Sequence, residues 1–319
     1  MAHKIGDYKN GIFHAGVLPN MLVDNQFLKC VSFLLIDRQN PDTLKQERIP
    51  IATAFFVSMP IINDYAQIYA VTARHVIYET ARGNLYLRLK SSNDDYEDVV
   101  VLPDNWICHP KTDVAVIPIE IPDKHDCKII PLEALATEKF ITDNEVSTGD
   151  DVFFVGLFTA YSGQKHDRPI VRFGNISLMK EEIPLKLVPG SETKTLVDAY
   201  LVESRSWGGQ SGSPAFVYFP VDREPGIIKF GGQQFALLGL THGHYNITQD
   251  VKFAGDILGS GKVPINAGIA LVIPADKIIE TLMEKQLLEE RERDLIKYQN
   301  SLSSPTPDIT YPIVFVRLS

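Results

Sequence analysis

IPIATAFFVSMPIINDYAQIYAVTARHVI, residues 49–77, contains the pattern that decides the fold. Two apolar runs of strand length, rich in β-branched and aromatic residues, are joined by a short connection that contains Asn63 and Asp64. Such runs, bounded by turn residues, are typical of β-strands. They recur along the chain in two groups, separated by a charged, proline-containing segment at about 120–150. Because no helical segments lie between these strands, we expect two barrels or sandwiches instead of a parallel sheet with crossover helices.

The predicted fold class is therefore all-β, with two six-stranded antiparallel β-barrels and a C-terminal α-helix. A helix is expected after Pro274-Ala275-Asp276, because apolar residues follow at helical spacing. The charged middle of this helix, EERERD, is interpreted as a solvated face. The expected divisions are an N-terminal segment at 1–19, a first barrel at 20–145, a second barrel at 146–275, the helix at 276–300 and a tail at 301–319.

The composition excludes several classes of protein. The 319 residues are 45% hydrophobic and 22% charged, which are ordinary values for a globular chain. The net charge is −9, and no cluster of basic residues offsets it, so we expect no nucleic-acid partner. No run of about 18 apolar residues exists, so no membrane partner is expected. Cys30, Cys108 and Cys127 form no Cys-x-x-Cys motif, and no secretory signal is readable, which predicts a cytoplasmic protein.

The strongest local motif is Gly208-Gly209-Gln210-Ser211-Gly212-Ser213-Pro214. Glycines beside a serine let the backbone turn tightly, expose the hydroxyl and leave N–H groups free for a developing oxyanion. The alternative interpretation is a glycine-rich turn between two strands. A nucleophilic serine also needs a base and a group that orients the base.

Two upstream residues complete such a set. His75 ends an apolar strand, and Asp113 begins another, DVAVIPI. Taken singly, these would be a packed core histidine and a turn or cap residue. Together with Ser211 they follow the order His, Asp, Ser, with the first two in the first strand group. This is the chain order of a chymotrypsin-like triad.

The motifs resemble those of trypsin-like, chymotrypsin-fold serine peptidases. Thr72-Ala73-Arg74-His75 is similar to the family's Thr-Ala-x-His, and Asp113-Val114-Ala115-Val116 to its Asp-aliphatic-Ala-aliphatic. Gly209-Gln210-Ser211-Gly212-Ser213-Pro214 resembles Gly-x-Ser-Gly-Gly-Pro, and AGIALVIP at 267–274 is similar to the end of an HtrA-type protease domain. The resemblance covers about residues 25–290.

This resemblance implies a peptidase that needs no cofactor and no metal and cleaves protein or peptide substrates. His75 would be the base, Asp113 would orient it, and Ser211 would be the nucleophile. The N–H groups of Gly209 and Ser211 would form the oxyanion hole. The resemblance also implies a chymotrypsin-like arrangement of the two barrels.

Several departures from the family pattern concern regulation. Val76 replaces a cysteine that secreted members use in a disulfide, in agreement with a reducing compartment. Gln210 replaces the aspartate that pairs with a newly cut N-terminus in trypsin, so activation by that ion pair is not available. About 20 residues follow the helix, too few for the PDZ module of HtrA proteins. We therefore expect narrow specificity, a regulatory protein partner, or an oxyanion loop at Ser206–Gln210 that is disordered until it is needed.

By the same resemblance, the substrate pocket would contain Arg205, Thr241, His242, Gly243 and His244. Arg205 falls where trypsin has its acidic pocket floor, so a cation there would favour Glu, Asp or Gln before the cut. The alternative is that Arg205 points to solvent and the two histidines are structural.

Three other interpretations compete with this one. An α/β-hydrolase needs Gly-x-Ser-x-Gly and a later histidine, yet Ser213 stands at the fifth position and no histidine follows His244. Paired cysteines and histidines, such as Cys108-His109, lack the Cys-x-x-Cys spacing of a structural zinc site. A non-catalytic or partner-gated binding module on a protease fold stays open, because an idle triad and an active one have the same sequence.

Overall fold

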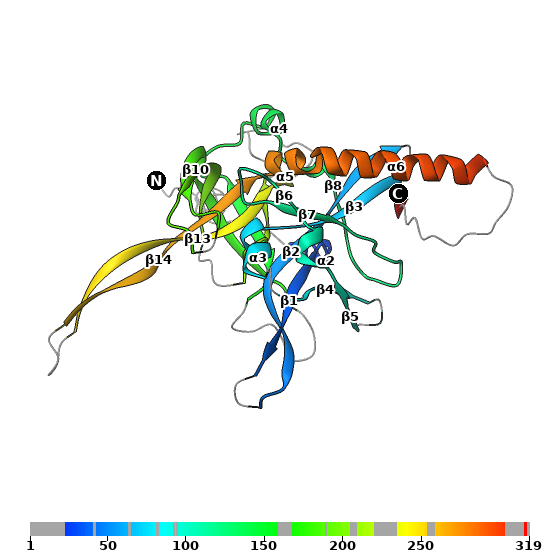
Figure 1. Cartoon of the computed structure of the whole chain (residues 1–319). Coiled ribbons are helices and arrows are strands. Elements are labelled where there is room, and N and C mark those ends of the chain that lie inside the picture. The colour runs from blue at the N-terminus through cyan, green and yellow to red at the C-terminus, as the bar shows by residue number, and fades with distance from the viewer. Residues whose placement is uncertain are drawn as a thin grey trace, which may run out of the picture.

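The strands of the protein form two sheets, with helices at the C-terminal end (Figure 1). The computed structural model describes the backbone of residues 23–40, 43–62, 65–80, 83–91, 93, 95–158, 168–188, 190–204, 209–219, 235–253, 259–303 and 316–317. Within this part of the chain, no helix is both long and apolar enough to cross a membrane.

The first sheet has the strand order β5-β4-β1-β2-β3-β7-β6, with β8 added on β2 and β15 on β3. Its strands are β1 (Val31–Gln39), β2 (Gln46–Ile62), β3 (Tyr65–Thr72), β4 (Leu85–Lys90), β5 (Tyr96–Val100), β6 (Ile107–Cys108), β7 (Ala115–Pro118), β8 (Ile130–Pro131) and β15 (Val316–Arg317). Two short helices, α2 (Asn25–Lys29) and α3 (Arg74–Glu79), and 3-10 turns at Pro103–Asn105 and Leu132–Ala134 accompany it.

The number of strands in this sheet differs from the sequence prediction. Six were expected, whereas the described residues contribute nine. Three of them, β6, β8 and β15, are only two residues long. Two residues are too few to carry an alternating pattern, so β6 and β8 could not be predicted. The third, β15, lies in the strand-like stretch ITYPIVFVRLS that ends the predicted tail, and it pairs with β3.

The second sheet is a closed barrel of six strands in the order β10-β11-β14-β13-β12-β9. These are β9 (Asp151–Gly156), β10 (Ile170–Leu185), β11 (Thr195–Glu203), β12 (Pro214–Tyr218), β13 (Phe235–Phe253) and β14 (Gly259–Pro274). The far ends of β13 and β14 extend from the barrel as a two-stranded arm (Figure 1). Helix α4 (Glu138–Asp143) precedes the barrel. The predicted all-β class is confirmed: the nine-stranded sheet (the first unit) and the six-stranded barrel (the second unit) are followed by a C-terminal helical segment.

The C-terminal helical segment is two helices instead of the one predicted at 276–300. Helix α5 (Ala275–Leu282) ends where the N–H of Met283 turns to the carbonyls of Ile279 and Glu280, and α6 (Lys285–Ser303) follows. The solvated interpretation of EERERD was wrong for Arg291, which is buried. Its guanidinium donates to the Tyr69 hydroxyl and to the Leu282 carbonyl, both at 2.7 Å.

The two β units share one apolar core, so they cannot shift freely against each other. Phe27 of α2 packs edge-on against Phe153, Phe216 and Phe235 of the second unit, with ring centroids 5.1, 5.0 and 4.7 Å apart. The same core includes Phe55 of β2. Edge-to-face contacts of this kind add to the free energy gained by burial itself.

Gly239→Ala is expected to destabilise the second barrel. A Cβ atom at position 239 would lie 1.8 Å from the carbonyl oxygen of Ile273 on the neighbouring strand, so the backbone would have to move. We expect the free energy of unfolding to fall by about 1–3 kcal/mol. The control is Gly83→Ala, where no atom lies within 4 Å of the new Cβ. Equal urea midpoints for the two variants would contradict the tight approach of β13 and β14.

Candidate active site

His75 is the second residue of α3, which begins directly after strand β3. Its backbone N–H donates to Oδ1 of Asp113, and its ring Nδ1 lies 2.8 Å from Oδ2 of the same carboxylate. Two contacts from one residue fix both the position of the helix and the plane of the ring. The ring is mostly shielded, with 15% of its side-chain surface exposed.

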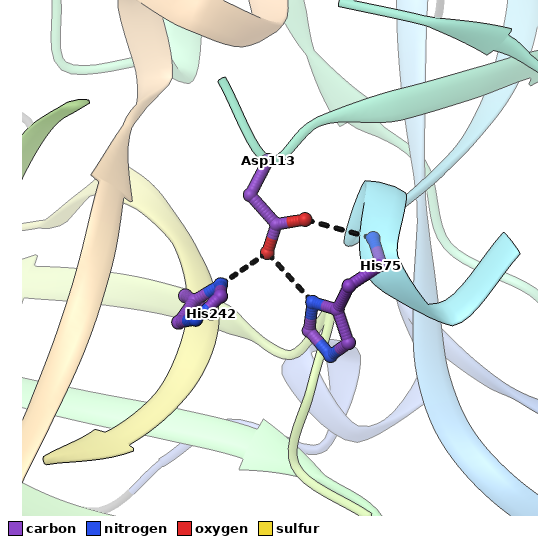
Figure 2. A group of neighbouring side chains, drawn as sticks. All are labelled: His75, Asp113 and His242. Atoms are coloured by element: carbon purple, nitrogen blue, oxygen red, sulfur yellow. Dashed lines mark hydrogen bonds and ion pairs between the residues drawn. The ribbon is translucent and has the colours of Figure 1, made fainter. Parts of the chain in front are cut away.

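Asp113 lies in the turn between β6 and β7, and its side chain is fully buried. A second histidine, His242 of β13, places its Nδ1 2.5 Å from the same Oδ2 (Figure 2). The two imidazole rings stand edge to face, with centroids 5.0 Å apart. The carboxylate is therefore held by three nitrogen donors from two different elements of the fold.

Ser211 lies between the two units, in the segment that precedes β12. Its Oγ is 3.0 Å from Nε2 of His75, on the opposite side of the ring from Asp113. The hydroxyl also lies 3.2 Å from the carbonyl oxygen of His242. The structure thus brings together the three residues that the sequence predicted as a triad.

The loop that carries Ser211, residues 209–213, has a backbone that requires glycine at two places. Gly209 and Gly212 have φ angles of 91° and 79°, where a side chain would be strained. A Cβ on Gly212 would also lie 2.2 Å from the carbonyl oxygen of Thr53. Within the described part of the chain, the N–H groups of Gly209 and Ser211 donate to no protein acceptor.

Thr53 of β2 ties this loop to the first unit, a role that the sequence analysis missed. Its N–H donates to the Ser211 carbonyl at 3.0 Å, and its hydroxyl donates to the Gly209 carbonyl at 3.1 Å. Its own carbonyl accepts the hydroxyl of Thr72, three residues before His75. Only its position as the one polar residue within ATAFFV could have drawn attention to it.

The charges at the site favour an ionised aspartate and a basic histidine. Burial alone would raise the pKa of Asp113, but the two neighbouring histidines outweigh it and hold that pKa well below its usual range. Burial alone would lower the pKa of His75. The charge of Asp113 and its hydrogen bond outweigh burial, so the pKa of His75 lies above its ordinary value of 6.5.

The residues predicted to bind substrate have different surroundings. Arg205 lies outside the described residues. Thr241 is buried, and its backbone bonds Gly212 and Ser213. His242 turns toward Asp113, while Gly243 and His244 follow it on β13 with part of their surface exposed. The pocket role of these residues stays a prediction, and the bond from His242 to Asp113 was not foreseen.

His75, Asp113 and His242 are also a set that could hold a metal ion, because their ligand atoms lie within 4.8 Å of one another. Ligand atoms at about 2.0–2.1 Å from a tetrahedral zinc ion lie about 3.3 Å apart. Here the two nitrogens are 2.8 and 2.5 Å from the carboxylate oxygen, which are hydrogen-bond distances. The arrangement fits a hydrogen-bonded cluster better than a metal centre.

Comparisons with known proteins find solved protease structures that are similar to this chain only at low sequence identity. No family model and no curated protein matches the chain. The apo protease domain of MamO from Magnetospirillum magneticum has a TM-score of 0.43 and 13% identity, over 81% of this chain and 98% of that one. The inactive form of the Rv3671c protease has a TM-score of 0.42 and 17% identity, over 88% of this chain and 96% of that one. The HtrA-like subtype and the cytoplasmic location stay predictions.

Asp113→Asn is expected to reverse the shift of the His75 pKa. Without the negative charge, burial becomes the dominant influence, so the pKa should fall from above 6.5 to below it. Titration of nitrogen-15-labelled histidine by NMR measures this directly. The control is Glu79→Gln, because the charge of Glu79 raises the pKa of His75 less than the charge of Asp113 does. We expect this control to lower the His75 pKa much less than Asp113→Asn. A His75 pKa that is the same in Asp113→Asn and in the unchanged chain would refute the electrostatic coupling.

Proposed function

We propose that the chain is a serine endopeptidase that cleaves peptide bonds through an acyl-enzyme. The observation that supports this most strongly is the position of one imidazole between a buried carboxylate and a serine hydroxyl, at 2.8 and 3.0 Å. Nucleophile, base and orienting group in hydrogen-bond contact are the requirements for an activated serine.

In the proposed mechanism, Ser211 Oγ attacks the carbonyl carbon of the scissile peptide bond, and Nε2 of His75 takes the hydroxyl proton. The imidazolium then gives this proton to the leaving amine, while Asp113 stays ionised and holds Nδ1–H. Water then attacks the carbonyl carbon of the acyl-enzyme while Nε2 of His75 takes a proton from it. The imidazolium returns this proton to Ser211 Oγ, and the acid product leaves. The low pKa of Asp113 and the raised pKa of His75 suit these two roles.

The proposed oxyanion hole consists of the backbone N–H groups of Gly209 and Ser211. Both amides lack a protein acceptor among the described residues, and the positive φ of Gly209 turns its peptide plane as only glycine readily allows. A preorganised donor of this kind contributes about 3–4 kcal/mol to stabilising the transition state.

Ser211→Ala is expected to abolish covalent labelling by a fluorophosphonate probe, because the attacking oxygen is gone. The matched control is Ser213→Ala, which removes a buried hydroxyl two residues away that has no hydrogen-bond partner among the described residues. We expect this control to be labelled like the unchanged chain, and both variants to melt within a few degrees of it. Mass spectrometry of the labelled protein gives the readout, and labelling of Ser211→Ala at another residue would refute the assignment.

The competing proposal is a non-catalytic or partner-gated binding module on the same fold. It is favoured by the second acceptor of the Ser211 hydroxyl, the His242 carbonyl at 3.2 Å, which competes with His75 for the proton. Failure of the purified, unchanged chain to react with the probe would support this proposal. Labelling that appears only after a protein partner is added would indicate gating.

The proposed substrate preference is for an acidic or amide side chain before the cut. It rests on Arg205 in the sequence and on His244, which lies half-buried on β13 two residues beyond His242. Cleavage of a peptide library, read by mass spectrometry, should occur mainly after Glu, Asp or Gln. Arg205→Ala should reduce this preference by about tenfold or more, because the like-charge exclusion of basic residues is lost. Cleavage mainly after Lys, Arg or aromatic residues would show that Arg205 does not face the pocket.

A further inference from the structure

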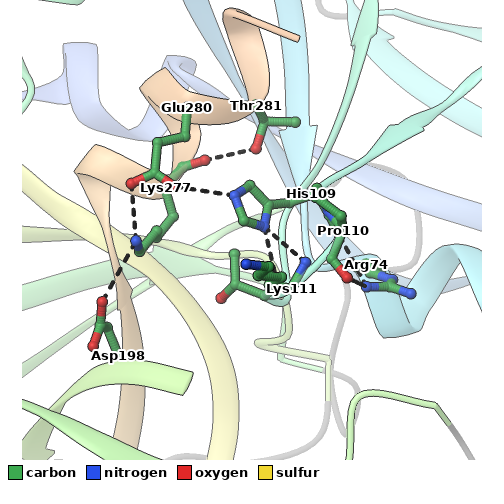
Figure 3. A network of polar contacts seen from close by, with 9 residues as sticks. Arg74, His109, Pro110, Lys111, Asp198, Lys277, Glu280 and Thr281 are labelled. Atoms are coloured by element: carbon green, nitrogen blue, oxygen red, sulfur yellow. Dashed lines mark hydrogen bonds and ion pairs between the residues drawn. The ribbon is translucent and has the colours of Figure 1, made fainter. Parts of the chain in front are cut away.

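A second histidine–carboxylate pair lies beside the site, at the turn of residues 109–114 that carries Asp113 (Figure 3). The ring of His109 is buried, and its Nε2 lies 3.1 Å from Oε2 of Glu280 on α5. Its Nδ1 faces the backbone N–H groups of Lys111 and Thr112, at 3.1 and 3.0 Å. No step of the proposed mechanism uses this ring.

The contacts of the ring assign its tautomer. Two N–H donors point at Nδ1, so this nitrogen carries the lone pair and the proton lies on Nε2, where Glu280 accepts it. Burial lowers the pKa of His109, and the hydrogen bond and charge of Glu280 oppose this shift only in part. At neutral pH the ring is therefore uncharged and keeps both backbone hydrogen bonds.

The turn is closed on itself and joined to the helix of the candidate base. The N–H of His109 donates to the carbonyl of Val114 at 2.9 Å, and this hydrogen bond closes the turn that contains Asp113. Arg74, the residue before His75, donates to the carbonyls of His109 and Pro110 at 2.9 and 3.1 Å. A change in the shape of this turn would therefore move both Asp113 and α3.

The opposite side of the ring is anchored on the second unit. Glu280 also accepts a hydrogen bond from Lys277 at 2.8 Å, and Lys277 lies 3.4 Å from Asp198 of β11 (Figure 3). Helix α5 begins directly after β14, a strand of the barrel that precedes it. His109 thus connects the turn of Asp113 in the first unit to the unit that carries Ser211.

We propose that His109 is a positioning residue: its ring holds the turn of Asp113 and anchors that turn on α5, so that Asp113, His75 and Ser211 stay in line. The inference rests on the proposed peptidase function, which it deepens. His109 contacts neither the candidate nucleophile nor the base, so its effect passes through the turn.

Three variants test the role of the ring. His109→Leu removes both its contacts, whereas His109→Asn keeps an acceptor near the place of Nδ1. His125→Leu is the matched control, because His125 is also buried and pairs its Nε2 with Glu97 at 3.0 Å, outside the site. We expect His109→Leu to lower kcat about 10- to 100-fold with little change in KM, because a displacement of about 1 Å at a reacting group has an effect of this size. His109→Asn keeps the acceptor for the backbone of the turn but not the bond to Glu280, so it should recover part of that loss. His125→Leu should keep kcat.

Equal kcat values for His109→Leu and the unchanged chain would overturn the proposal, as would a His109→Asn enzyme as slow as His109→Leu. If His109→Leu does not fold, the bond between His109 and Glu280 can be tested from the side of Glu280. The side chain of Glu280 is half-exposed, so its substitution should disturb folding less. Glu280→Leu should then lower kcat, and Glu280→Gln, which keeps an acceptor for Nε2–H, should restore it. Full activity of Glu280→Leu would refute the anchor on α5.

A readout that needs no turnover separates this inference from the proposed function. The proton that His75 Nδ1 shares with Asp113 can be followed by NMR in the folded chain. We expect its signal in the unchanged chain and in His109→Asn, and its loss or broadening in His109→Leu. If the unchanged chain neither reacts with fluorophosphonate nor cleaves peptides, the proposed function fails. An unaltered signal in His109→Leu would then still overturn the positioning role.

Discussion

The buried carboxylate of Asp113 is the constraint on which the rest of the site depends. A carboxylate without exposed surface is costly unless donors replace the water it has lost. Here the replacement comes from the N–H and Nδ1 of His75 and from Nδ1 of His242. One histidine belongs to the first unit and the other to the second, so the charge is satisfied only when both units are assembled. Burial of a single charge therefore couples the folding of the two units to the geometry of the site.

The position of Ser211 depends on a second set of contacts, made by Thr53. Its hydroxyl donates to the Gly209 carbonyl and accepts the N–H of Leu157 at 2.9 Å, so one side chain joins two segments of the second unit to β2. Each neutral hydrogen bond of this kind contributes about 1 kcal/mol net, but leaving a buried partner unpaired costs about 1–3 kcal/mol. The distance from Ser211 to His75 is thus maintained by contacts of Thr53 with the backbone of neighbouring segments, and these contacts do not involve the reacting groups.

The fold class could be predicted from the sequence, and so could the three residues His75, Asp113 and Ser211, because each of these residues stands in a short, specific motif. It could not show the bond from His242 to Asp113, since a one-residue change of register in β13 alters which side chains face inward. A shift in the pairing of β13 with β14 lies at Thr241–Gly243, and a sequence carries no sign of such a bulge. The role of His109 was equally hidden, because its partner Glu280 is 171 positions away along the chain. Contacts between units depend on tertiary packing, and local patterns do not encode them.

The hydroxyl of Ser211 has one proton and two acceptors, and the protonation state of His75 decides between them. When Nε2 of His75 is bare, it accepts the hydroxyl proton across 3.0 Å. When the ring is protonated, Nε2–H donates to Oγ instead, and the hydroxyl proton turns to the carbonyl of His242 at 3.2 Å. The same heavy-atom positions serve both states, so gaining or losing the ring proton requires no movement of the backbone. Residue 242 bonds Asp113 through its side chain and Ser211 through its carbonyl, and it therefore contacts both ends of the hydrogen-bonded chain that passes through His75.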